Sequence, residues 1–123
     1  MKIKNYEAIN AYAKLGEILK NYSFKARVCQ AIVYNKNKLK EIADNFEEAR
    51  QTLVKSLADK DENGEPIVKD NNYVIRDKDR LNKEFAELQV IESDIELKPI
   101  SVDDLEDKEI NGADYEALSI FID

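Results

Sequence analysis

The chain has 123 residues, of which 43% are hydrophobic and 37% charged, a composition that fits one folded domain spanning residues 1–123. Its formal net charge is −7, and it contains one Cys and neither His nor Trp. These absences exclude His-based catalytic triads, the common thiolate zinc sites and CxxC redox chemistry.

The sequence gives no sign of a membrane or export signal. It lacks the run of about 18 apolar residues that a transmembrane helix needs, and its start, MKIKNYEAINAY, lacks the apolar core of a signal peptide. We therefore expect a soluble intracellular protein with no membrane partner.

The charges are distributed unevenly along the chain. Residues 1–56 carry 11 Lys and Arg against 6 Asp and Glu, a net charge of +5, whereas residues 91–123 carry 2 against 11, a net charge of −9. Such a gradient indicates either a surface with two electrostatic faces or two halves that fold together with opposite charges in contact.

The first predicted element is a helix over residues 6–21, with Asn5 as a candidate N-cap. Its apolar positions recur at spacings of three and four residues. They are Ile9, Tyr12, Leu15, Ile18, Leu19 and Tyr22.

A much longer helix is predicted over residues 23–57, with Ser23 as its cap and a length of about 50 Å. It has a heptad seam, in which spacings of four and three residues alternate. The seam consists of Val28, Ile32, Asn35, Leu39, Ile42, Phe46, Ala49 and Leu53.

This seam has more apolar surface than short neighbouring helices could cover, so it predicts self-association as a homodimer through Ile32, Asn35, Leu39 and Ile42. A single Asn on such a seam typically fixes register or partner number by bonding to a polar group across the interface. Equally, Asn35 could lie where the seam is exposed or where it meets a helix terminus.

The rest of the chain is predicted to form shorter elements. Turn residues and two β-branched or aromatic triplets predict a β-hairpin over residues 66–76. Asp77 or Asp79 then caps a helix of about 12 to 15 residues that we expect to pack antiparallel on the long helix, forming a helical hairpin with the β-ribbon at its tip.

The last third has three predicted elements: a strand or extended segment over residues 95–100, a short turn capped by Ser101, and a helix over residues 113–120. Asn111-Gly112 is expected to end the turn, and the final helix is expected to dock through four side chains. These are Tyr115, Leu118, Ile120 and Phe121. The predicted fold class is therefore mainly α, a helical hairpin or bundle with a small β component.

Residues 59–70 carry the one motif that resembles a metal site. Read as a calcium loop, the segment places oxygen ligands at Asp59, Asp61 and Asn63, Gly64 at the tight turn, and a carboxylate at Asp70. Pro66 at the eighth position, the short reach of Asp70 and the strand that follows argue against calcium. A turn set by Asp, Asn and Gly explains the same residues, so no metal or cofactor is expected.

Other candidate sites have simpler structural explanations. The acidic pairs Asp77/Asp79 and Asp103/Asp104 sit in turns and helix caps, so no catalytic residues are expected. The lysines of YNKNKLK spread around a helix and the net charge opposes nucleic acid, so direct nucleic-acid binding is not expected. Cys29, one residue off the seam, is expected to be half-buried.

Several phrases of the sequence resemble a known family. KIKNYEAI, the hairpin KDENGEPIV with NNYVI, the helix DRLNKEFAELQ and the ending DIELKPISVDDLEDKEINGADYEALSIFID are similar to small phage and prophage proteins of Gram-positive bacteria, a family described only as a domain of unknown function. The resemblance implies a phage origin and a place in the host cytoplasm or the virion, and it transfers no catalytic residues.

Two functions follow as hypotheses. The first is a non-enzymatic phage accessory protein that binds protein partners, for example in tail morphogenesis. The second is an anti-defence inhibitor, similar in class to anti-CRISPR proteins, whose acidic C-terminal third occupies the nucleic-acid groove of a host nuclease. The expected partner-binding residues are Asp103, Asp104, Glu106, Asp107 and Glu109.

Overall fold

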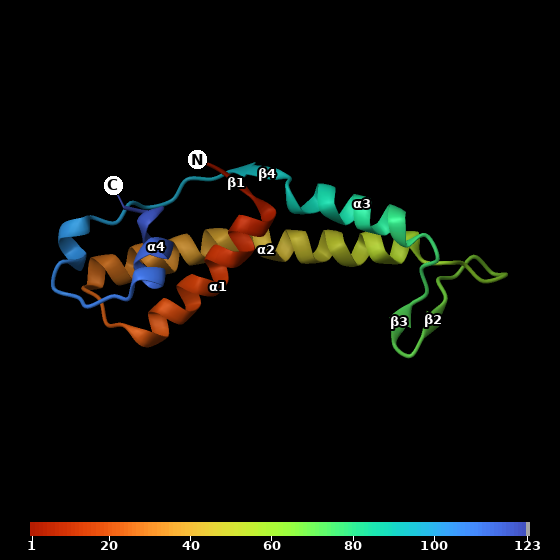
Figure 1. The fold of residues 1–123 in the computed structure, drawn as a ribbon, viewed down its shortest axis with the longest axis horizontal. Helices are drawn as coiled ribbons and strands as arrows, with labels where there is room; N and C mark the ends of the chain where they lie inside the picture. Colours follow the sequence, from red (N-terminus) through yellow and green to blue (C-terminus); the bar gives the residue numbers. More distant parts are fainter. Residues whose placement is uncertain (123) are drawn as a thin grey trace.

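The computed structural model describes residues 1–122, and its longest helix is α2 (Ala26–Leu57) (Figure 1). Helix α1 (Asn5–Asn21) packs antiparallel to the N-terminal half of α2, and α3 (Lys78–Gln89) packs beside its C-terminal half. Helix α4 (Gly112–Ser119) packs on α1. The chain is 60% helical, which confirms the mainly α prediction.

At the end of the molecule away from the two termini, α2 and α3 form the predicted helical hairpin with a β-ribbon at its tip (Figure 1). This part is called the distal hairpin below. Strand β2 (Val68–Lys69) pairs antiparallel with β3 (Asn72–Tyr73), within the predicted range of residues 66–76. The connecting Asp70 and Asn71 have φ angles of 54° and 65°, the left-handed region that Asn and Asp tolerate better than most residues.

A second pair of strands joins the N-terminus to the end of α3. Strand β1 (Lys2–Lys4) runs antiparallel to β4 (Glu92–Asp94), with Ile3 opposite Ser93. Of the two alternatives for residues 95–100, a strand or an extended segment, only the strand is wrong, because residues 95–99 form no strand and Ile100 makes just an isolated bridge, to Ile122. Within this segment the backbone of Lys98 bonds to a side chain of α2 instead.

Some predicted caps are confirmed and others are wrong. The Asp77 carboxylate accepts a hydrogen bond from the Arg80 N–H at 3.0 Å and caps α3. Ser23 lies outside α2, which begins after Lys25 without a side-chain cap, and Ser101 makes no cap bond at the short 3₁₀ turn Val102–Leu105. Asn111 does not end the short turn, which stops at Leu105, but caps the start of α4.

Asn5 is the first residue of α1 rather than its cap. Its backbone N–H donates to the Ile91 carbonyl at 3.0 Å, and its side-chain amide donates to the Leu88 carbonyl at 2.8 Å. These bonds tie the start of α1 to the end of α3, since Leu88 lies in the last turn of that helix and Ile91 follows it.

The core lies around the N-terminal half of α2, and the chain covers its own seam there. Ile32, Asn35 and Leu39 are each 0% exposed, and Ile42 is half-buried. The expectation that these residues form an interface with a second chain is therefore wrong, because α1 and the C-terminal segments already cover them. The homodimer itself stays a prediction, because the C-terminal seam residues Ala49 and Leu53 are only half-buried.

The C-terminal anchors divide into two groups. Leu118 and Phe121 are buried in the core, as expected. Tyr115 and Ile120 are 40% and 48% exposed, so they do not anchor the segment. Helix α4 is only two turns long, and one narrow stripe of it can face the core.

Candidate functional site

Opposite charges from the N-terminal and C-terminal parts of the sequence meet at the proximal end of the molecule, the end opposite the distal hairpin. Asp104, which is 9% exposed, accepts two hydrogen bonds from the Arg27 guanidinium, one of them from Nε at 2.9 Å. Lys25 Nζ lies 3.9 Å from the same carboxylate. The Arg27 hydrogen bonds hold the pKa of Asp104 below its usual value.

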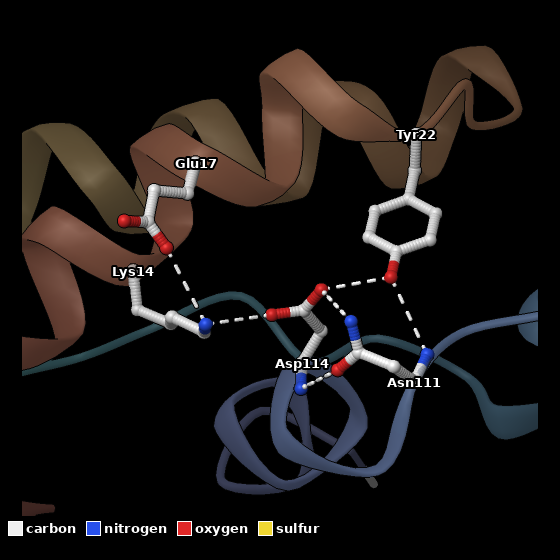
Figure 2. A network of polar contacts seen from close by, with 5 residues as sticks. All are labelled: Lys14, Glu17, Tyr22, Asn111 and Asp114. Atoms are coloured by element: carbon white, nitrogen blue, oxygen red, sulfur yellow. Dashed lines mark hydrogen bonds and ion pairs between the residues drawn. The ribbon is translucent and has the colours of Figure 1, made fainter.

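A second buried carboxylate joins α4 to α1 (Figure 2). Asp114, 4% exposed, lies 2.8 Å from Lys14 Nζ and accepts hydrogen bonds from the Tyr22 hydroxyl at 2.7 Å and from Asn111 Nδ2 at 2.8 Å. The bond from Lys14, followed by that from Tyr22, lowers the pKa of the Asp114 carboxyl. Glu17 contacts the same lysine at 3.3 Å.

This network was missed at the level of sequence, although a signal for part of it exists. Asn111 Oδ1 accepts from the Asp114 N–H at 2.8 Å, and Asn followed three residues later by an acid is a helix-start pattern. The bonds from Lys14 and Tyr22 join residues that are 100 and 92 positions apart in the sequence, and they have no local signature.

The five predicted partner-binding carboxylates do not form one surface. Asp103, Glu106, Asp107 and Glu109 are exposed, and none has an ion pair within 4.0 Å among residues 1–122. Asp104 is a correction, because it is buried and belongs to the internal contact with Arg27. The −9 segment thus partly neutralises the basic N-terminal half and partly faces solvent.

The candidate calcium ligands are not brought together. Asp59 Oδ2 lies 2.8 Å from Arg76 Nε, and Asp61 Oδ1 accepts from the N–H groups of Asn63 and Glu65 at 2.8 and 3.0 Å. Asp70 lies in the turn between β2 and β3. Within the described part of the chain, no three acidic, His or Cys side chains form a cluster that could hold a metal ion.

We predict that calcium has no specific effect on this loop. Because Asp61 already serves as a turn acceptor and Asp59 pairs with Arg76, millimolar calcium should release no heat in a titration and leave the melting temperature unchanged. Magnesium at equal concentration is the control for ionic strength. A calcium-specific rise in melting temperature that Asp61→Asn abolishes would contradict this prediction.

Cys29 also differs from its expectation, since its side chain is exposed rather than half-buried.

Two lysines lie against the ring of Tyr34. Lys38 Nζ is 5.5 Å from the centre of the ring, and Lys98 Nζ is 4.6 Å from it. The contact from Lys98 attaches the segment around residue 98 to α2, whereas Lys38 and Tyr34 both lie on α2 itself.

A wide opening lies in the distal hairpin, where the sequence had suggested no site. Helices α2 and α3 flank a groove of about 600 Å³, whose walls are two helical stripes. The α2 stripe comprises Asn45, Glu48, Ala49, Thr52, Leu53 and Ser56, and the α3 side comprises Glu84, Glu87, Leu88 and Ile91.

Comparison of the chain with protein-family models, with curated proteins and with solved structures finds no significant match in any of the three. None of the helices within residues 1–122 combines the length and the hydropathy needed to cross a lipid bilayer.

Proposed function

We propose that this protein is a non-enzymatic accessory protein of a phage or prophage that acts by binding another protein, for example during tail assembly in the host cytoplasm. The observation that carries the proposal is the incomplete cover of the distal hairpin. Helix α3 is amphipathic, yet none of its residues is fully buried, and Val90 and Ile91 just after it are 51% and 53% exposed.

An amphipathic helix is stabilised mainly by burying its apolar side. Two helices packed side by side bury less apolar surface than three helices packed together. In this hairpin the aromatic contact between Phe46 and Phe85, with ring centres 6.0 Å apart, lies between the two helices. The apolar surface beside it stays accessible. A protein partner would cover this apolar surface, because exposed apolar surface commonly marks an interaction site.

The alternative function is an anti-defence inhibitor, and the exposed part of the acidic segment favours it. Asp103, Glu106, Asp107 and Glu109 face solvent at the proximal end and could take the place of phosphates in the basic groove of a host nuclease. Asp104 has no part in this alternative because Arg27 binds it internally.

Affinity capture from phage-infected host cells separates the two functions. The bait is the full chain, compared with a variant that combines Asp103→Asn, Glu106→Gln, Asp107→Asn and Glu109→Gln and keeps Asp104. We expect both baits to retain the same virion structural protein, because the distal hairpin is unchanged. A nuclease retained by the wild type alone, and released by salt, would favour the alternative. Retention of no specific protein by either bait would contradict both functions.

A further inference from the structure

The distal groove combines an apolar floor with an acidic rim. Leu53 and Leu88 are half-buried and Ile91 is 53% exposed along the floor. The rim carries Glu48, Glu84 and Glu87, and no Lys or Arg lines the groove. None of these three glutamates makes an ion pair within 4.0 Å in the part of the chain that the structure describes, which leaves three negative charges beside an open apolar surface.

The shape of the groove fits a helix. Its α2 wall follows positions 45, 48, 49, 52, 53 and 56, one stripe at helical spacing, and its α3 side follows positions 84, 87, 88 and 91. The α2 stripe spans about 16 Å, or about three helical turns. A third helix lying between α2 and α3 would bury its apolar stripe on Leu53, Leu88 and Ile91.

We infer that this groove binds an amphipathic, basic helix of about three turns from a protein partner. The inference rests on the proposed function and names the surface and the chemistry of the partner. Its apolar stripe would cover the floor, and its flanking Lys or Arg side chains would meet Glu48, Glu84 and Glu87. Two copies of the chain joined groove to groove would instead bring six glutamates together, which disfavours a second copy as the occupant.

A synthetic peptide tests the inference directly. The probe is a fluorescein-labelled 14-residue peptide, about four turns long, with Leu at spacings of three and four and Lys at the flanking positions. A matched peptide carries Glu in place of Lys. Measured by fluorescence anisotropy, the full chain should bind the basic peptide with a dissociation constant of roughly micromolar order and the acidic peptide at least about tenfold more weakly.

Two groove variants and one control locate the binding. The double variant Glu84→Lys/Glu87→Lys should weaken the basic peptide by at least about tenfold and improve binding of the acidic one. Ile91→Ser, which changes a half-exposed side chain, should weaken both. The control Glu62→Lys/Glu65→Lys changes the net charge equally in the exposed loop before β2 and should bind like the wild type.

Equal binding by the groove variants and the control would overturn the inference, because attraction would then follow net charge alone. A dimer in light scattering that Ile91→Ser converts to a monomer would also overturn it, since the occupant would be a second copy. The capture experiment keeps the two proposals separate. If a structural protein is retained equally by wild type and by Glu84→Lys/Glu87→Lys, the groove inference fails and the proposed function stands.

Discussion

Replacement of Asn35 by Leu is expected to lower the free energy of unfolding by roughly 2–4 kcal/mol while leaving the molecular mass in solution unchanged. Asn35 is 0% exposed, its Oδ1 accepts from the Lys98 N–H at 2.7 Å, and its Nδ2 donates to the Lys98 carbonyl at 2.9 Å. Leu removes both bonds and leaves the backbone N–H and carbonyl of Lys98 without partners at a partly buried position. Its greater hydrophobicity recovers only part of that cost.

Urea denaturation followed by circular dichroism measures this effect, and light scattering measures the mass. Asn37→Leu is the matched control, because Asn37 lies on the same helix but is exposed, and its replacement should change stability by less than about 0.5 kcal/mol. A change of mass in Asn35→Leu, or a loss of stability no larger than that of the control, would show that Asn35 does not act through Lys98.

The heptad seam shows what periodicity can and cannot predict. The spacing correctly predicted a long helix and residues that are buried in the fold, such as Ile32 and Leu39. It could not identify what covers them, because the same seam fits a second chain or other parts of the same chain. The partner of Asn35 is a backbone segment 63 positions away, which has no periodic pattern of its own.

The acidic segment shows a similar limit for charge. Asp103 and Asp104 are neighbours with the same composition around them, yet the first is exposed and the second is buried. The 3₁₀ turn places only Asp104 against Arg27, so the outcome depends on how the turn docks on α2. A charge gradient along the sequence left open whether opposite charges meet or face solvent, and both occur here.

Loss of the two buried carboxylates, Asp104 and Asp114, is expected to reduce the acid sensitivity of folding. Contacts with Arg27 lower the folded-state pKa of Asp104, and contacts with Lys14 and Tyr22 lower that of Asp114. Each carboxylate therefore stabilises the fold at pH values above its unfolded pKa of about 3.9, and this stabilisation is lost as the pH falls through the folded-state pKa. The melting temperature of the wild type should be level from about pH 5 to 7 and should fall below about pH 4.

The variant Asp104→Asn/Asp114→Asn tests this expectation through melting temperatures measured between neutral and acidic pH. It should melt several degrees lower than the wild type at pH 7, and the two curves should converge in acid, because protonation removes from the wild type the charges that the variant already lacks. Glu47, whose pKa is lowered to about 2 by hydrogen bonds from Arg50 and then Gln51, is present in both proteins and cancels in the comparison. The control Asp103→Asn/Glu106→Gln removes two exposed carboxylates and should follow the wild-type curve. Curves for the wild type and the Asp104→Asn/Asp114→Asn variant that stay parallel at every pH would show that these ion pairs do not link folding to protonation.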